Sequence, residues 1–137
     1  MYKIGQLAKL ANVTPDTIRF YEKQGLMGHQ IRTEGGYRLF TEQDLQRLRF
    51  IRYAKQLGFT LETITELLSI RVDPAHHTCQ ESKQIVDERL ADVESKIQEL
   101  TIMRDSLKML SAACCGDEHA TTYCSILETL EKGAASK

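Results

Sequence analysis

Four cysteines and one histidine are the side chains of this chain with the clearest capacity for chemistry. Cys114, Cys115, His119 and Cys124 lie in one short segment, and Cys79 stands well upstream of it. In a reducing cytosol such thiols stay unpaired, which favours metal binding or redox chemistry over a disulfide framework. Thiolate sulfur and imidazole nitrogen are ligands of zinc, so the segment predicts a metal site. The alternative is a set of incidental buried cysteines.

The spacing of these ligands favours two metal positions over one. Cys114 and Cys115 are adjacent, so in an extended segment their side chains point to opposite sides and cannot easily hold one ion. Cys124 can then return to Cys114, which leaves His119 to share the second ion with Cys115. Tetrahedral zinc takes four ligands, and Cys79 is the remaining thiol. This surplus of thiolates favours zinc, cadmium or lead over copper.

A long helix must separate Cys79 from the other ligands. Residues 80–110 contain no Gly or Pro, and their apolar residues recur in alternating steps of four and three, as in a coiled-coil seam: Val86, Leu90, Val93, Ile97 and Leu100. At about 1.5 Å per residue, such a helix holds Cys79 on the order of 50 Å from the cysteine segment of its own chain. In an antiparallel dimer, Cys79 of the partner subunit would lie beside that segment and bridge both ions.

The coiled-coil seam also needs a surface to cover it. A single apolar stripe on a long helix is stable only against a second surface, either the same helix of a second subunit or the chain's own N-terminal part. The length and regularity of the seam favour the homodimer.

The N-terminal segment has the pattern of a helix-turn-helix. Apolar residues at positions 4, 7, 8 and 11 predict a first helix that ends near Asn12. Thr14 then offers a capping oxygen to a second helix, Pro15 suits its first turn, and Gly25 ends it. In a helix-turn-helix, the second helix enters the major groove of DNA.

Two further elements extend this pattern. Gly35 and Gly36 separate two short strand-like runs within residues 31–40, as a hairpin wing requires. Thr41 caps a helix that ends at Gly58, and a shorter helix ends before Pro74. The longer helix presents the basic residues Arg47, Arg49 and Arg52.

Charge is distributed unevenly along the chain. Residues 1–55 carry a net charge of +5 and residues 56–137 carry −6, although the whole chain sums to only −1. The basic half favours a polyanion as its partner, unless the asymmetry is a chance feature of solvated surface. No stretch approaches the roughly 18 uncharged apolar residues of a membrane span, so we expect a cytoplasmic protein without membrane attachment.

Six motifs in the chain form one recognisable set. They are residues 4–8 (IGQLA), 14–22 (TPDTIRFYE), 32–38 (RTEGGYR), 57–59 (LGF), 76–79 (HHTC) and the cysteine segment at 114–124. With the first four motifs the chain resembles the MerR family of metal-responsive transcription regulators. The last two motifs resemble the zinc-responsive branch of that family, and the resemblance covers nearly the whole chain.

The resemblance implies a mainly α-helical homodimer built from three parts. These are a winged helix-turn-helix DNA-binding domain at 1–70, a linker and long dimerisation helix in an antiparallel coiled coil at 71–112, and a metal-binding loop with a short helix at 113–137. Expected DNA contacts are Thr17, Arg19 and Tyr21 in the second helix and Tyr37 and Arg38 in the wing. By the same resemblance, Cys114 and Cys124 hold one zinc ion, Cys115 and His119 hold the second, and the partner subunit's Cys79 is shared.

The implied function is a zinc-responsive switch at a promoter. The homodimer would bind promoter DNA with an overlong spacer between the polymerase recognition elements and repress weakly without metal. On binding two zinc ions per loop, it would distort the DNA so that bacterial RNA polymerase transcribes a zinc-export gene. The nearest alternative is a cadmium- or lead-responsive sibling regulator. An iron–sulfur redox regulator would need closely stepped cysteines, and an enzyme would need an orienting group beside Cys115 and His119.

Overall fold

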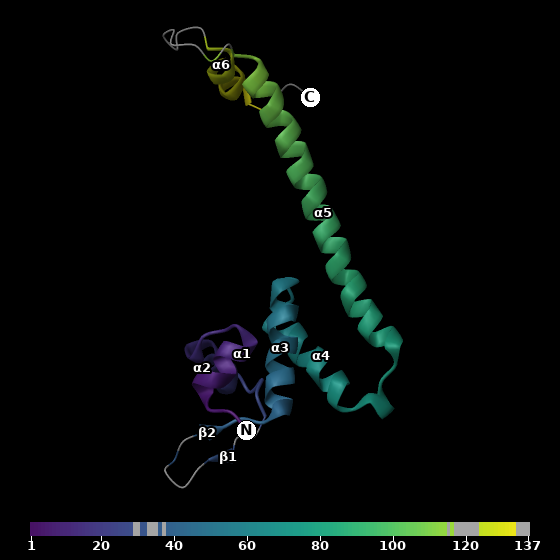
Figure 1. The fold of residues 1–137 in the computed structure, drawn as a ribbon. Helices are drawn as coiled ribbons and strands as arrows, with labels where there is room; N and C mark the ends of the chain where they lie inside the picture. Colours follow the sequence, from purple (N-terminus) through teal and green to yellow (C-terminus); the bar gives the residue numbers. More distant parts are fainter. Residues whose placement is uncertain (29–30, 33–35, 37, 115, 117–123, 134–137) are drawn as a thin grey trace. The chain divides into compact units, whose positions relative to one another are not determined.

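The computed structural model describes residues 1–28, 31–32, 36, 38–114, 116 and 124–133. The fold is mainly α-helical, which confirms the predicted fold class (Figure 1). The chain divides into two compact units, residues 1–89 and residues 90–137. The boundary between the units falls inside the helix that spans Cys79–Ala112.

Two short helices open the first unit as a helix-turn-helix. Helix α1 spans Ile4–Ala11 and helix α2 spans Pro15–Lys23. Asn12 ends α1 in the left-handed conformation, with φ 57° and ψ 47°. The Thr14 side chain then accepts a hydrogen bond from the Thr17 backbone N–H at 3.1 Å, which caps α2 as predicted.

A minimal hairpin follows the two helices. Strand β1 (Ile31–Arg32) pairs antiparallel with strand β2 (Arg38–Leu39), with Ile31 opposite Leu39. Tyr2 and Phe40 form an isolated bridge that ties the start of the chain to the end of β2. The hairpin therefore lies against the helix-turn-helix, as a wing does.

Two helices and one short 3₁₀ turn connect the hairpin to the long helix that follows. Helix α3 spans Glu42–Gln56, helix α4 spans Leu61–Val72, and the 3₁₀ helix η1 spans Pro74–His76. Thr41 and Asp44 cap α3 reciprocally, through hydrogen bonds of 2.8 and 3.2 Å between the side chain of each and the backbone N–H of the other. The short turn η1 has no counterpart in the sequence interpretation.

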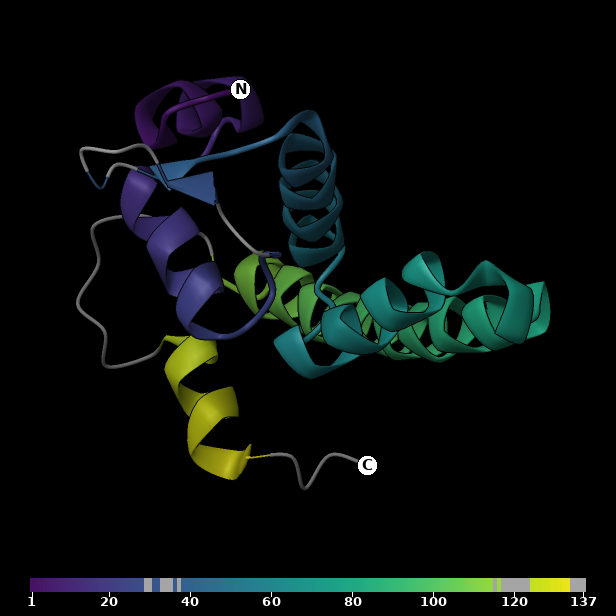
Figure 2. The same ribbon diagram turned by 90° about the horizontal axis from the view of Figure 1, so that it is seen from below.

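One hydrophobic core holds the elements of the first unit together. Figures 1 and 2 show α1, α2 and the two strands grouped beside α3, and α3 packs against both α1 and α4. The largest fully buried side chains of the described residues come from the four helices α1 to α4 and from the segments between them: Leu7, Ile18, Leu26, Phe40, Leu48, Ile51 and Ile64. Burial of each such side chain contributes roughly 1.5–3 kcal/mol, so the core fixes how α2 and the hairpin are presented.

Two more helices follow in the described chain, α5 (Cys79–Ala112) and α6 (Ser125–Lys132). The helix predicted over residues 80–110 is confirmed and begins one residue earlier, at Cys79 itself. The seam residues Leu90 and Ile97 are 51% and 58% exposed, so within the described residues of this chain the seam faces solvent. In that same part of the chain, no helix has the length and apolar character needed to span a membrane.

Candidate DNA interface and metal centre

Helix α2 carries three of the expected DNA contacts and presents them differently. Arg19 is exposed and forms an ion pair with Asp16 at 2.8 Å, one turn earlier. Thr17 is half-buried, and its hydroxyl lies 2.9 Å from the Thr14 hydroxyl in the cap of the helix. Of these two residues, Arg19 is therefore the one whose long side chain faces outward.

Tyr21 lies in the core, although the sequence analysis expects it at the DNA. Only 7% of its surface is exposed, and burial raises the pKa of its hydroxyl. The neighbouring Phe20 is 46% exposed, and its ring centroid lies 5.8 Å from that of Tyr21. The solvent-facing aromatic residue of α2 is thus Phe20, a residue that sequence reasoning missed because two adjacent aromatics gave no signal of which one faces inward.

The wing residue Arg38 is tied to the second helix of the motif. Its guanidinium forms an ion pair with Glu22, whose side chain is only 10% exposed. This pair holds β2 against α2 and leaves Arg38 partly exposed beside Arg19. The expected contact Tyr37 lies outside the described residues.

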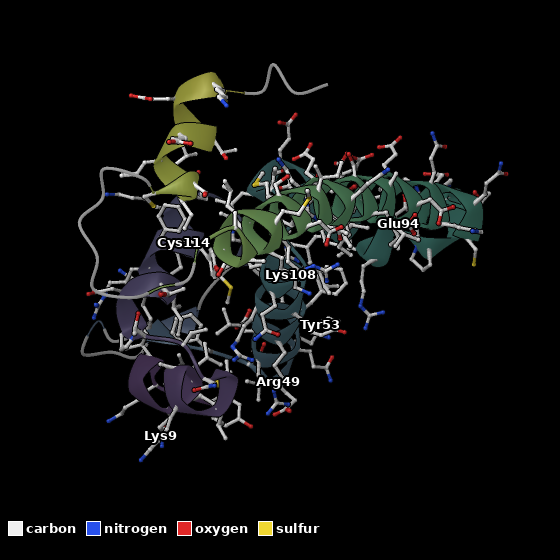
Figure 3. All side chains as sticks on the ribbon, turned by 90° about the horizontal axis from the view of Figure 1, so that it is seen from above. Lys9, Arg49, Tyr53, Glu94, Lys108 and Cys114 are labelled. Atoms are coloured by element: carbon white, nitrogen blue, oxygen red, sulfur yellow. The ribbon has the colours of Figure 1, made fainter. Side chains whose placement is uncertain are left out.

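A basic hollow of about 750 Å³ lies where α1, α2 and the hairpin meet. Among the described residues that line it, four are basic and none is acidic: Lys3, Lys9, Arg19 and Arg38. Figure 3 shows Lys9 pointing outward from α1. The sequence interpretation did not include Lys3 and Lys9 among the expected DNA contacts, since nothing in the linear chain places them beside α2. Four positive side chains around one concavity favour binding of a phosphate backbone.

Two arginines of helix α3, Arg47 and Arg49, are placed differently. Arg47 donates a hydrogen bond from Nε to the Leu26 carbonyl and thereby braces the turn after α2. Arg49 is exposed near Tyr53 on the outer side of α3 (Figure 3). The sequence interpretation grouped Arg47 with the outward-facing arginines, whereas the structure uses it to hold the helix-turn-helix.

The metal ligand Cys79 is the first residue of α5 and is exposed. A capping pair fixes this helix start: the Thr78 N–H donates to Glu81 Oε1 at 3.2 Å, and the Glu81 N–H donates to Thr78 Oγ1 at 3.4 Å. His77 lies 2.8 Å from Glu81, and this hydrogen bond, together with the Thr78 N–H, lowers the pKa of the Glu81 carboxyl. His76 lies 2.7 Å from Asp73. Both histidines are therefore engaged by carboxylates next to Cys79.

Cys114 and Cys124 are brought together after the end of α5, at the point labelled in Figure 3. Their Sγ atoms are 3.9 Å apart. Zinc–thiolate bonds of about 2.3 Å at tetrahedral angles place two sulfurs about 3.8 Å apart, whereas a disulfide requires about 2.05 Å. The separation between the two thiols therefore fits two ligands of one metal ion.

The start of α6 favours the charged form of Cys124. The backbone N–H of Leu127 lowers the pKa of the Cys124 thiol, and the Ile126 N–H and the Cys114 thiol act in the same direction. These groups stabilise a thiolate, which is the form that binds metal. Cys115 and His119, the expected ligands of the second ion, lie outside the described residues. In the part of the chain that is described, no three side chains of ligand type cluster closely enough to hold an ion.

Cys79 and Cys114 flank opposite ends of α5. The helix has 34 residues, which corresponds to a length of about 50 Å. Within the chain, the pair of Cys114 and Cys124 therefore forms without Cys79.

Comparisons with known proteins find one family over most of the chain. The family of MerR HTH regulatory proteins matches residues 2–70, and the family described as MerR, DNA binding, matches residues 45–110. The HTH-type transcriptional regulator ZntR of Escherichia coli (strain K12) is 67% identical over 135 residues, which cover 98% of this chain and 96% of that protein.

Two solved structures share the fold. The transcription regulator PbrR691 of Ralstonia metallidurans CH34, solved in complex with lead(II), is 38% identical, covers 95% of this chain and 99% of that chain, and has a TM-score of 0.79. HiNmlR, a MerR family regulator that lacks the sensor domain and was solved bound to promoter DNA, is 28% identical, covers 82% of this chain and 84% of that chain, and has a TM-score of 0.60.

Proposed function

This chain belongs to the MerR family of helix-turn-helix regulatory proteins, and from that premise we propose that it is a zinc-responsive switch at a promoter. It is a transcriptional regulator, like the relative that it matches at 67% identity, and not an enzyme. The function has two parts, which are DNA binding by the first unit and metal sensing by the cysteines.

The observation that carries the metal part is the placement of Cys114 and Cys124. Their Sγ separation of 3.9 Å suits tetrahedral thiolate coordination, and the N-terminal N–H groups of α6 favour the Cys124 thiolate. Cys115 and His119 supply a second position from the same loop. A set of thiolate ligands with one imidazole suits zinc. In this function the zinc ion is the signal that the regulator detects, and it has no catalytic role.

A second copy of the chain completes this site. The seam along α5 is apolar and exposed, so the same seam of another subunit covers it. In an antiparallel pair, the start of one α5 lies beside the end of the other, and the partner subunit's Cys79 bridges both ions. Metal binding thus joins residues of both subunits, which makes the relative placement of the subunits depend on metal.

The DNA part of the function uses the basic hollow and the outward side of α2. Lys3, Lys9, Arg19 and Arg38 meet phosphates, and the exposed part of α2 enters the major groove. Two such units in a dimer contact two half-sites of one promoter. RNA polymerase binds the same promoter, and its access to both recognition elements depends on how the spacer between them is twisted.

The switch requires only that metal favour one of two DNA-bound conformations. Moving such an equilibrium from 1:99 to 99:1 takes about 5.5 kcal/mol of differential binding. Structural zinc–thiolate sites bind with about 10 kcal/mol or more, so a fraction of that energy suffices. Bending and untwisting a promoter costs several kcal/mol by elastic estimates, which is the same scale. Zinc can therefore activate a zinc-export gene without a large change in operator affinity.

Transcription in vitro from a long-spacer promoter tests this function. The assay contains reduced protein, bacterial RNA polymerase and free zinc buffered across a range, with copper as the control metal. Transcription is expected to rise with zinc and not with copper. The variant with Cys114→Ser and Cys124→Ser should still bind the promoter and show no rise. If zinc does not raise transcription by the parent protein, the proposal is refuted.

A cadmium- or lead-responsive regulator is the second candidate. The observation in its favour is the lead(II) complex of the 38% identical PbrR691, whose fold this chain shares. The same transcription assay decides between them when cadmium and lead are buffered in place of zinc. Activation by lead or cadmium at far lower free metal than by zinc, with no response to zinc in its own buffered range, would favour the sibling function.

A further inference from the structure

We propose that Arg89 is a positioning residue that fastens the start of α5 to the end of α3 and so transmits the metal state of the C-terminal unit to the DNA-binding unit. The inference rests on the proposed function, because it names the contact through which metal binding reaches the DNA. Arg89 is the last residue of the first compact unit, and the following residues of α5 belong to the unit that holds the cysteine pair.

The contact is a hydrogen bond across a long stretch of sequence. Arg89 Nε donates to the carbonyl oxygen of Leu57 at 2.9 Å, and the two residues are 32 positions apart. Leu57 is the C-cap of α3. The last carbonyls of a helix lack partners within the helix and carry its negative dipole end, so a guanidinium is well suited to that place.

The next residue, Gly58, provides the space that the guanidinium occupies. Its φ is +85°, and a Cβ atom added there would lie 2.1 Å from Arg89 Nη2 and 2.7 Å from Arg89 Cζ. Any other residue type would therefore strain the backbone and displace the arginine. Because Gly58 has no side chain, the Arg89 guanidinium can lie against the backbone at the end of α3. Gly58 and Arg89 together form the joint between α3 and α5.

An apolar contact supports this joint from the same side of α5. Ile85 is partly buried and packs against the hydrophobic core of the first unit. Residues four apart lie on one face of a helix, so Ile85 and Arg89 together hold the first turns of α5 against that core. The seam residues Val86 and Leu90, in contrast, are 49% and 51% exposed and remain available to a second subunit.

The held element, α3, is connected to the recognition helix through packing. Helix α3 packs on α1, and α1 packs on α2, with Leu48, Leu7 and Ile18 in the same fully buried core. A close-packed core passes on a rigid displacement instead of absorbing it. A change in the direction of α5 that follows metal binding therefore moves α3 and, with it, the helix that reads DNA.

The test compares Arg89→Ala with a matched control on the same helix. Lys96 lies one heptad after Arg89, at the same position relative to the seam, and pairs only loosely with Glu99 at 3.3 Å on an exposed surface. Any effect on the coiled coil itself should appear in both Arg89→Ala and Lys96→Ala. Four quantities are measured for each full-length dimer: zinc affinity, operator affinity, zinc-induced distortion of the promoter spacer by permanganate reactivity, and zinc-induced transcription.

Arg89→Ala is expected to leave zinc affinity and operator affinity within about twofold of the parent and to lower the zinc-induced rise in transcription roughly fivefold, with a matching loss of spacer distortion. Lys96→Ala should behave like the parent, and Arg89→Lys, which can still donate to the Leu57 carbonyl, should restore part of the response. A merely structural role would instead lower operator affinity in the presence and absence of zinc.

Gly58→Ala gives an independent check on the same joint. It should lower the zinc response in the parent background by displacing Arg89 and by straining the backbone at φ +85°. In the Arg89→Ala background only the backbone strain remains, so the further loss should be smaller than the loss in the parent background. A normal zinc response in Arg89→Ala, or a loss of operator binding without zinc, overturns the inference. If the parent itself fails to respond to zinc, the proposed function falls as well, so the two failures are distinguishable.

Discussion

A mixed dimer gives the sharpest test of where Cys79 acts. One subunit carries Cys79→Ser, and the other carries Cys114→Ser with Cys115→Ser. If each loop takes Cys79 from the opposite chain, both defects fall on the loop of the second subunit. The first subunit's loop then keeps Cys114, Cys115, His119 and Cys124 together with the partner subunit's Cys79.

The size of the expected effect follows from the length of α5. The 34-residue helix is about 50 Å long, whereas a zinc–sulfur bond is about 2.3 Å, so Cys79 cannot serve the loop of its own chain while α5 stays helical. The parent dimer should hold about four zinc ions, two in each loop, at full affinity. The mixed dimer should hold half of that zinc at full affinity, and neither homodimer of the variant chains should hold any.

The assay is a zinc titration of reduced, affinity-separated mixed dimers against a competing chelator. Circular dichroism of the parent, both homodimers and the mixed dimer serves as the control for intact helices. An intact site in the mixed dimer supports the antiparallel intersubunit arrangement. The absence of a full-affinity site would refute it, since both loops are damaged only if Cys79 serves its own chain. A parent stoichiometry of one zinc per dimer would contradict the two-position argument.

Three further predictions concern the DNA interface, the core and the pH dependence. Lys3→Ala and Lys9→Ala should each weaken operator binding without changing zinc affinity. Each substitution removes one phosphate contact per subunit, so in the dimer it should reduce the slope of log affinity against log salt by about 1.8, measured by fluorescence anisotropy. An unchanged slope would show that the hollow does not contact DNA. Tyr21→Ala should lower the free energy of unfolding by about 3 kcal/mol in urea denaturation, because only 7% of that residue is exposed. Phe20→Ala should cost little stability and weaken operator binding. Loss of operator binding in Tyr21→Ala with little loss of stability would show that Tyr21 is the residue that faces DNA. Zinc uptake should release protons and weaken as the pH falls, since the ligands bind as thiolates. The lowered pKa of Cys124 should keep that ligand deprotonated to a lower pH than an ordinary thiol. Calorimetry in buffers of different ionisation enthalpy measures the proton release, and zinc uptake without proton release would exclude thiol ligands.

The sequence alone determined the elements whose signals are local. Thr14 with Pro15 marks the start of α2, Thr41 with Asp44 marks the start of α3, and the Gly- and Pro-free seam marks α5. Such caps and periodicities involve residues within a few positions of each other, so they act before any tertiary contact forms. The proximity of Cys114 and Cys124 was accessible for the same reason, because the two residues are only ten positions apart.

Only the tertiary structure decided which side chains of each element are free to act. Tyr21 and Phe20 are adjacent aromatics, and the hydrophobic core of the first unit buries Tyr21 and leaves Phe20 exposed. Arg47 donates a hydrogen bond to the Leu26 carbonyl and Arg38 forms an ion pair with Glu22, although in the sequence both residues read as exposed basic side chains.

The longest-range arrangements were the least accessible from the linear chain. Lys3 and Lys9 join Arg19 across the hollow, and Arg89 reaches the Leu57 carbonyl from 32 positions away. These contacts depend on where a shared hydrophobic core places whole helices. Periodicity identifies which face of a helix is apolar, but it carries no information on which distant residue that face will bring into contact.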